Sequence, residues 1–137
     1  MAIKLPVAVR NARLDAIETA IGTSAVLKIR TGAPPTNVSD ADMGTVLATF
    51  NLPSDWMAAA ANGSKAKSGT WQDAAADATG TAGHFRVYAS DGTTVHIQGT
   101  VTAQGGGGDM ELQQATADIV AGQTVTINTF TLTDGNA

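Results

Sequence analysis

Apolar and polar side chains alternate along two neighbouring runs in the middle of the chain, on either side of a Ser-Asp-Gly turn. The alternation and the turn predict a β-hairpin, and with it a β-rich domain. A three-residue loop at 90–92, with its glycine in a left-handed conformation, would pair Val87 with Val95. The same register sets Phe85 opposite Ile97, so we expect these four apolar side chains to share one buried face.

The two histidines of the chain, His84 and His96, occupy polar positions in the same two runs. We therefore expect both imidazoles on the outward face of the hairpin. A Ser-His-Asp site needs a nucleophile within reach of such a base, and no nucleophile-elbow motif accompanies either histidine. The sequence gives no indication of catalysis, and we expect no enzyme activity.

The N-terminal region has the apolar spacing of a helix, which we expect over residues 6 to 21, with a proline at its start and a glycine just after its end. Val7, Leu14, Ile17 and Ile21 would form one apolar stripe along it. In the simpler interpretation this stripe packs on the sheet of the same chain. In the alternative the helix is an arm that docks on a neighbouring protein.

Candidate contacts with another protein come from this helix and from two tryptophans in small-residue surroundings. Tryptophan is enriched at interface hot spots but also fills cores, and the shortage of aromatic residues favours the core for at least one of the two. The six candidate interface residues are Arg10, Arg13, Leu14, Ile17, Trp56 and Trp71.

Short alternating runs separated by turn residues continue to the C-terminus and predict seven or eight strands. They cover residues 25–30, 46–52, 65–71, 84–89, 94–98, 110–112, 119–120 and 124–132. Residues 54–61 fit either a short helix or a strand of small side chains, whereas 31–42 and 72–83 are typical of surface loops. In the last run the apolar parity changes near Asn128, which indicates a β-bulge or a strand that changes sheets.

These elements predict a mainly β fold, an antiparallel β-sandwich of jelly-roll or immunoglobulin-like type, with an N-terminal α-helix. We expect a helical arm over residues 1–22 and the sandwich domain over 23–137. The length of 137 residues fits one domain, and an aromatic content of 4% leaves a thin aliphatic core. A thin core favours additional burial against a partner or a second copy of the chain.

Charge and composition narrow the function classes. A net charge of −4 and a pI of about 4.8 argue against a general nucleic-acid binder, which needs a basic face. The chain has no cysteine for disulfides or thiolate metal sites. No apolar run approaches the length of a membrane span, and the N-terminus lacks the pattern of a secretion signal. We expect no direct contact with nucleic acid or with a membrane.

Two acidic pairs, Asp40 with Asp42 and Asp73 with Asp77, could offer oxygens to a cation. Neither pair has the spacing and the closing glutamate of a calcium loop, so we expect solvated turn residues. The four glycines at 105–108 lack the lysine and hydroxyl residue of a phosphate-binding loop and predict a flexible linker. We therefore expect neither a metal nor a cofactor.

Five segments together resemble small structural proteins of tailed phages, in particular the capsid cement (decoration) proteins of short-tailed Bordetella phages. The resemblance covers nearly all of the chain from Leu27 to Gly135. The segments are LKIRTGAPP, TVLATFNLPSDWM, SGTWQDAAAD, TGTAGHFRVYASDGTTVHIQGTVT and VAGQTVTINTFTLTDG.

The resemblance implies a jelly-roll β-sandwich that is assembled in the host cytoplasm and sits on the capsid exterior of a virion. The implied partner is the phage major capsid protein, whose neighbouring subunits such proteins tie together as a homodimer or another homo-oligomer. The alternative is another virion component, a tail or head-fibre protein that binds a host-surface glycan through its Gly-rich and Asp-rich loops.

Overall fold

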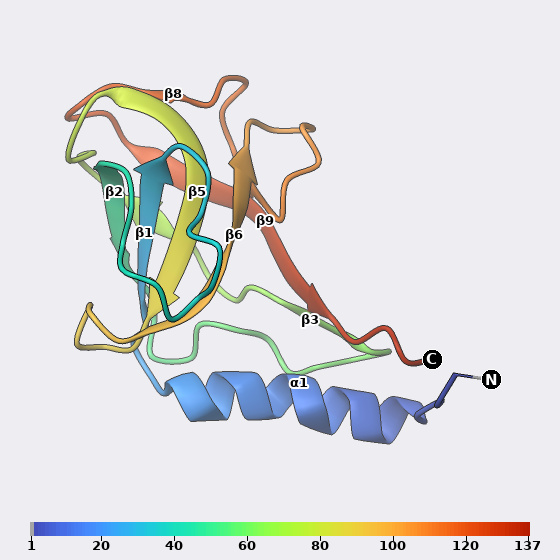
Figure 1. Ribbon diagram of the computed structural model, residues 1–137. Coiled ribbons are helices and arrows are strands. Elements are labelled where there is room, and N and C mark those ends of the chain that lie inside the picture. The colour runs from blue at the N-terminus through green and yellow to red at the C-terminus, as the bar shows by residue number, and fades with distance from the viewer. Residues whose placement is uncertain (1) are drawn as a thin grey trace.

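One curled β-sheet stands over a single N-terminal helix (Figure 1). The computed structural model describes residues 2–137. Within them the elements, in chain order, are α1 (Val7–Ile21), β1 (Val26–Thr31), β2 (Val46–Asn51), β3 (Ser64–Ala66), β4 (Gln72–Asp73), β5 (Gly80–Tyr88), β6 (Val95–Thr102), β7 (Met110–Leu112), β8 (Asp118–Ile119) and β9 (Val125–Thr133). The expected mainly β fold with an N-terminal helix is confirmed.

The strands form a mixed sheet in the order β2-β1-β5-β6-β7-β9-β3, with β8 beside β5 and β4 beside β9. Neighbouring strands are antiparallel except for β6 and β7, which are parallel. The sheet curls until its β2 edge meets the segment around β4. There the amide of Asp77 donates to the carbonyl of Leu47 at 2.8 Å, and the amide of Thr49 donates to the Asp73 carboxylate at 2.9 Å.

Strand β9 connects the parts of this sheet, because its start pairs with β4, its middle with β7 and its end with β3. Between the pairs Glu111–Thr129 and Leu112–Ile127, Asn128 is an extra residue on β9. This insertion is a β-bulge. The bulge predicted from the parity change near Asn128 is therefore confirmed.

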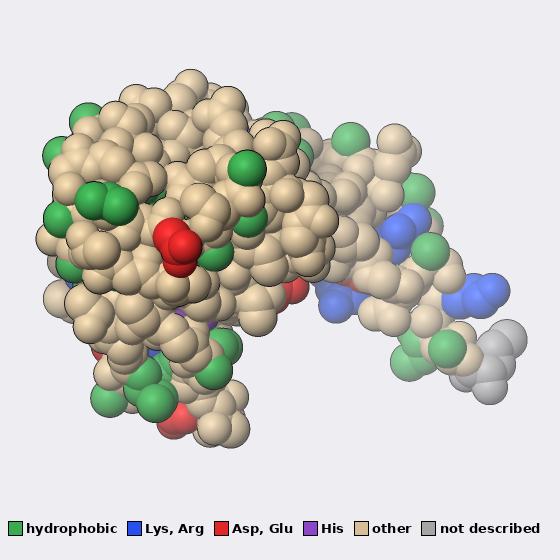
Figure 2. Space-filling model, turned by 90° about the horizontal axis from the view of Figure 1, so that it is seen from above, with side chains coloured by type: hydrophobic (Ala, Val, Ile, Leu, Met, Phe, Trp, Pro, Cys, Tyr) green, Lys and Arg blue, Asp and Glu red, His purple; other side chains and the backbone are tan. Residues whose placement is uncertain are grey.

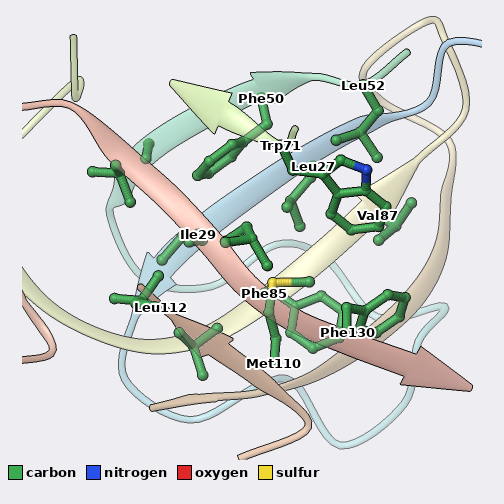
Figure 3. Close-up of a cluster of buried hydrophobic side chains, with 14 of the residues drawn as sticks. Leu27, Ile29, Phe50, Leu52, Trp71, Phe85, Val87, Met110, Leu112 and Phe130 are labelled. Carbon is green, nitrogen blue, oxygen red and sulfur yellow. The ribbon is translucent and has the colours of Figure 1, made fainter. Parts of the chain in front are cut away.

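The core is a cluster of buried aliphatic and aromatic side chains inside the curl of the sheet (Figure 3). A chain of aromatic rings runs through it. The ring centroids of Trp56 and Trp71 are 6.0 Å apart, and those of Trp71 and Phe130 are 5.6 Å apart. Phe85 meets Phe130 edge-on at 5.4 Å. Both tryptophans are fully buried. The prediction that at least one of them lies in the core is therefore confirmed.

The hairpin of β5 and β6 forms in a register that differs from the expected one. Val87 pairs with Ile97 instead of Val95, and Phe85 pairs with Gly99. The connecting loop is longer than three residues, and a register shift follows Val87 in the ladder. A slip of two residues keeps Ile97 on the face of Val87, so the apolar pattern could not distinguish these two pairings. The extra residue His96 sets Val95 opposite Tyr88 on the outward face, so the expectation that Val95 shares the buried face is wrong.

Of the two alternatives for residues 54–61, the helix is excluded. After a bend at 54–55 they run extended, with isolated bridges at Met57 and Ala61, and a tight turn at Asn62 and Gly63 leads them back into β3. Both turn residues have positive φ, 52° and 74°, as a two-residue hairpin turn requires. The stretch 72–83, expected as a loop, contains β4 and the first residues of β5.

We expect Phe130→Ala to destabilise the fold by about 3–5 kcal/mol, because it removes the ring that contacts both Trp71 and Phe85 and leaves a cavity. Urea unfolding followed by tryptophan fluorescence measures the change. Thr131→Ala, at an exposed position of the same strand, is the control and should cost less than about 1 kcal/mol. Equal losses for the two variants would contradict this account of the core.

Candidate interaction surface

Helix α1 contacts the rest of the chain through polar side chains as well as through its buried Leu14 and Ile21. Three backbone amides of residues 57–63 donate to side-chain oxygens of the helix. The pairs are Met57 to Glu18 at 3.1 Å, Ala60 to Asp15 at 2.9 Å and Gly63 to Asn11 at 2.9 Å. The helix thus hydrogen-bonds to the backbone amides of this segment and satisfies donors that would otherwise need water.

A buried lysine completes this contact. Lys65 is 2% exposed, and its Nζ lies 2.7 Å from an Asp15 oxygen, 2.8 Å from a Glu18 oxygen and 2.8 Å from the carbonyl of Ala58. Burial alone would lower the pKa of Lys65, but the hydrogen bonds from Lys65 to the two carboxylates outweigh it and raise that pKa. The same hydrogen bond, with the Ala60 amide, lowers the pKa of Asp15. Both partners therefore stay charged at neutral pH.

The first half of α1 is held to the C-terminal residues, and both chain ends lie on the same side of the molecule (Figure 1). The Nε of Arg13 lies 3.1 Å from the Asp134 carboxylate, and a guanidinium nitrogen of Arg10 lies 3.4 Å from the Asp134 carbonyl. Just before the helix, the amide of Leu5 donates to the carbonyl of Asn136 at 2.8 Å. These contacts and the Lys65 contact fix the rotation of the helix about its axis.

That rotation leaves apolar residues of α1 facing outward. Positions three and four apart lie on one side of a helix, and the side opposite the polar contacts carries mostly small or aliphatic residues. They are Val9, Ala12, Ala16 and Ala20, all exposed, with Arg13 as the one charged residue among them; Ile17, also exposed, lies at the edge of this side, within one turn of the buried Leu14 and Ile21. We call these six residues the outer face of α1. Val9 is 42% exposed and Ile17 is 37% exposed.

Seen from above, the molecule has a broad head and a narrower extension (Figure 2). The extension holds the first half of α1, β3 and the end of β9 (Figure 1). Most Lys and Arg side chains visible in this view lie on the extension, although the chain as a whole is acidic. Ile3, just before the helix, is 81% exposed and adds another apolar side chain near the chain ends.

The structure separates the six candidate interface residues. Trp56 and Trp71 are core residues, and Leu14 is buried against the chain at 3% exposure. Arg10 and Arg13 have intramolecular partners. Ile17 is the one apolar side chain of the six that is exposed. The expected stripe is also partly wrong: Leu14 and Ile21 are buried, but Val7 and Ile17 are not.

The two histidines differ, against expectation. His96 is exposed, whereas His84 is fully buried beneath the loop of residues 32–44, which we call the strap. The strap crosses the outward face of β5, so an outward position on this strand is covered by protein. The Nδ1 of His84 lies 2.8 Å from the carbonyl of Gly32, and its Nε2 has no partner among residues 2–137.

Asp42 of the strap binds the other polar side chains that the strap covers. Its carboxylate accepts hydrogen bonds from Arg30 at 2.8 Å, from Tyr88 at 2.7 Å and from Arg86. Burial opposes the charge of Asp42, but the bonds from Arg86 and Tyr88 and the charge of Arg30 outweigh it, so the pKa of Asp42 is lowered. Asp42 is exposed, as expected of a turn residue, but it is also the shared acceptor of two buried arginines, which was not expected.

Further contacts tie the strap to the sheet, from β5 and β6. A second nitrogen of Arg86 donates to the carbonyls of Val38 and Asp40, and the Gln98 amide donates to the carbonyl of Pro35. Basic residues at alternating positions of β1 and β5, with an acidic loop directly after β1, are the sequence features that would have indicated this cluster. The pattern alone does not say that the loop folds back over those strands.

Other acidic loop residues accept hydrogen bonds from backbone amides of their own loops. Asp91 accepts from the amides of Thr93 and Thr94, and these bonds, together with the one from the Thr94 hydroxyl, lower the pKa of Asp91. Glu111 accepts from two amides of the glycine run 105–108, which therefore has a defined hydrogen-bonded shape. Among residues 2–137 no three His, Asp or Glu side chains are grouped as metal ligands would be.

Comparison of the chain with protein-family models, with curated proteins and with solved structures gives no significant match. In the described part of the chain, no helix combines the length and the apolar character needed to cross a bilayer.

We expect Lys65→Met to loosen α1 from the extended segment 57–63, because two carboxylates lose the buried cation that they share. Hydrogen exchange of α1 amides should accelerate roughly tenfold or more, while β5 amides keep their protection. Lys67→Met is the matched control, since Lys67 makes a single bond to the nearby carbonyl of Gly69. Unchanged exchange in α1 would show that the lysine does not hold the helix.

Proposed function

We propose that the protein is a structural component of a phage virion, which binds the outer surface of an icosahedral capsid and cements neighbouring major capsid subunits. Two things support the proposal: the resemblance of the five segments to capsid cement proteins, and the outer face of α1. The second observation carries it, because a helix that turns aliphatic residues to the surface while its polar residues bind its own chain offers an apolar contact to another protein.

The outer face is suited to such a contact because it is rigidly presented. Lys65 and Asp134 hold the helix at its two halves, so little conformational freedom is lost when a partner covers it. Val9 and Ile17 supply the aliphatic side chains, and the alanines between them allow close approach of another backbone or side chain. Contact of this kind on two adjacent capsid subunits would tie them together.

The proposal includes the finer features that the resemblance implies. The protein would act on the virion exterior as a homodimer or another homo-oligomer, with the phage major capsid protein as its partner and with no catalytic role. Its curled sheet would be a variant of the jelly-roll sandwich of cement proteins.

The glycan-binding alternative has less support. Its candidate groups were the Asp-rich and Gly-rich loops, and the carboxylates of Asp91, Asp109 and Glu111 accept hydrogen bonds from residues of their own loops and strands. Carboxylates engaged in this way are less available to the hydroxyl groups of a sugar.

The proposal is tested by co-sedimentation with purified capsid shells of the parent phage. We expect the wild-type protein to bind shells, and Ala16→Glu to bind at least roughly tenfold more weakly, because it would bury an unpaired charge in an apolar contact. Ala115→Glu is the control: it adds the same charge at an exposed loop position away from the helix, and it should bind like the wild type.

A wild-type protein that never sediments with shells would overturn the proposed function. Equal binding by Ala16→Glu and Ala115→Glu would instead show that the capsid is bound through another surface than the outer face of α1.

A further inference from the structure

The two ends of the strap are joined by hydrogen bonds between Thr31 and Thr45, which we call its neck. Residues 32–44 take no part in the strand pairing of the sheet. The amide of Thr31 donates to the carbonyl of Thr45 at 3.1 Å, and the amide of Thr45 donates to the Thr31 hydroxyl at 2.9 Å. Beyond this neck, Arg30 pairs with Val46 in the ladder of β1 and β2. The eleven residues between the two ends of the strap could therefore move without breaking any strand pair, as in a compact Ω-loop.

Each end of the strap has a residue suited to act as a hinge. Gly32 and Gly44 have positive φ, 77° and 73°, a region that other residues rarely adopt. The first end also passes very close to β5: a Cβ added at Gly83 would lie 2.2 Å from the carbonyl of Gly32. The close approach at Gly83 lets the strap lie flat on the strand, and the two glycines allow its ends to turn.

The closed position of the strap leaves polar atoms unsatisfied. The Nε of Arg30 and the Nε2 of His84 are buried and have no hydrogen-bond partner among residues 2–137. Two arginines, Arg30 and Arg86, share the single carboxylate of Asp42, so the covered cluster also has an excess of positive charge. Unsatisfied buried polar atoms, here a donor on Arg30 and an acceptor on the neutral His84 ring, and excess charge are both unfavourable, and opening the strap would hydrate them.

His84 is the group in this cluster that can change charge near neutral pH. Because the carbonyl of Gly32 can only accept, Nδ1 carries the proton of the neutral ring, and Nε2 is the atom that a second proton would reach. The charged groups that face the ring are Arg30 on β1, Arg86 on β5 and Asp42 on the strap. A proton on Nε2 would add a third buried cation to a cluster that holds one carboxylate.

We propose that the strap is a pH-sensitive lid: protonation of His84 opens residues 33–43 about Gly32 and Gly44 while the sheet stays folded. Opening would expose the cationic face formed by Arg30 and Arg86. The proposal concerns the isolated chain and does not depend on capsid binding, so it can fail or succeed separately from the proposed function.

The direction of the pH effect follows from the environment of His84. Burial and the nearby arginines lower its pKa below the ordinary value of 6.5, and the carbonyl of Gly32 only partly opposes this. The closed strap is therefore fully stable above pH 6.5 and loses stability as the pH falls below that value. Asp42 keeps its charge throughout this range, because its own pKa is lowered.

The test is hydrogen exchange of the full-length protein at about pH 7.5 and about pH 5, with each group corrected for its intrinsic rate. The side-chain N–H groups of Arg86 donate to Asp42 and to carbonyls of the strap, and we expect their protection to fall roughly tenfold at the lower pH, while β5 amides keep theirs. His84→Asn keeps a donor for the Gly32 carbonyl but cannot be protonated, so it should abolish the fall. His96→Asn, at an exposed histidine, should behave like the wild type.

A second pair of variants tests the contact between Asp42 and the arginines. Asp42→Asn should lower the protection of the Arg86 side-chain N–H groups at both pH values, whereas Asp40→Asn, whose carboxylate bonds only to Asn37 nearby, should not. Equal wild-type protection of Arg86 at the two pH values, a pH effect that survives in His84→Asn, or exchange of Arg86 in step with β5 amides would each overturn the proposal.

Discussion

The buried ammonium of Lys65 determines which side of α1 the protein presents. Its Nζ lies between Asp15 and Glu18, and these two residues are also acceptors for the amides of Ala60 and Met57. A buried cation needs its carboxylates close by, so the helix must turn its charged side inward. The aliphatic residues on the opposite side are then left at the surface. The proposed capsid contact through the outer face of α1 depends on this orientation.

The same physical principle acts at the strap. Arg30 and Arg86 point outward from the sheet, where water would ordinarily solvate them, but the strap covers both and supplies Asp42 as their shared partner. In both places a buried cation on a strand is matched by carboxylates from an element that folds over it. The two places differ in their charge balance, because Lys65 has two carboxylates, whereas the two arginines share one. The strap cluster therefore holds more positive than negative charge, and this excess favours its opening.

The parts of the fold that depend on local patterns could be predicted, and those that depend on distant contacts could not. Helix α1, the strand β7 and the bulge at Asn128 follow from spacing along the chain alone. The hairpin register was missed because a shift of two residues keeps Ile97 on the face of Val87, and the extra residue His96, which turns Val95 outward, has no signal in the apolar pattern. The burial of His84 was missed because its cover comes from a loop more than 40 positions earlier in the chain. In α1 the apolar spacing suggested that Ile17 faces the core, yet the ionic contacts of Asp15 and Glu18 override that preference.

The two surfaces involve separate sets of contacts. The strap is held by residues of β1, β5 and β6, whereas α1 is held by Lys65, by segment 57–63 and by the C-terminal residues. Groups that share no partner contribute almost additively to stability. Opening of the strap can therefore change the charge that the head exposes without altering the position of the helix. Under the proposed function, the protein would hold a capsid through its helix while its strap responds separately to pH.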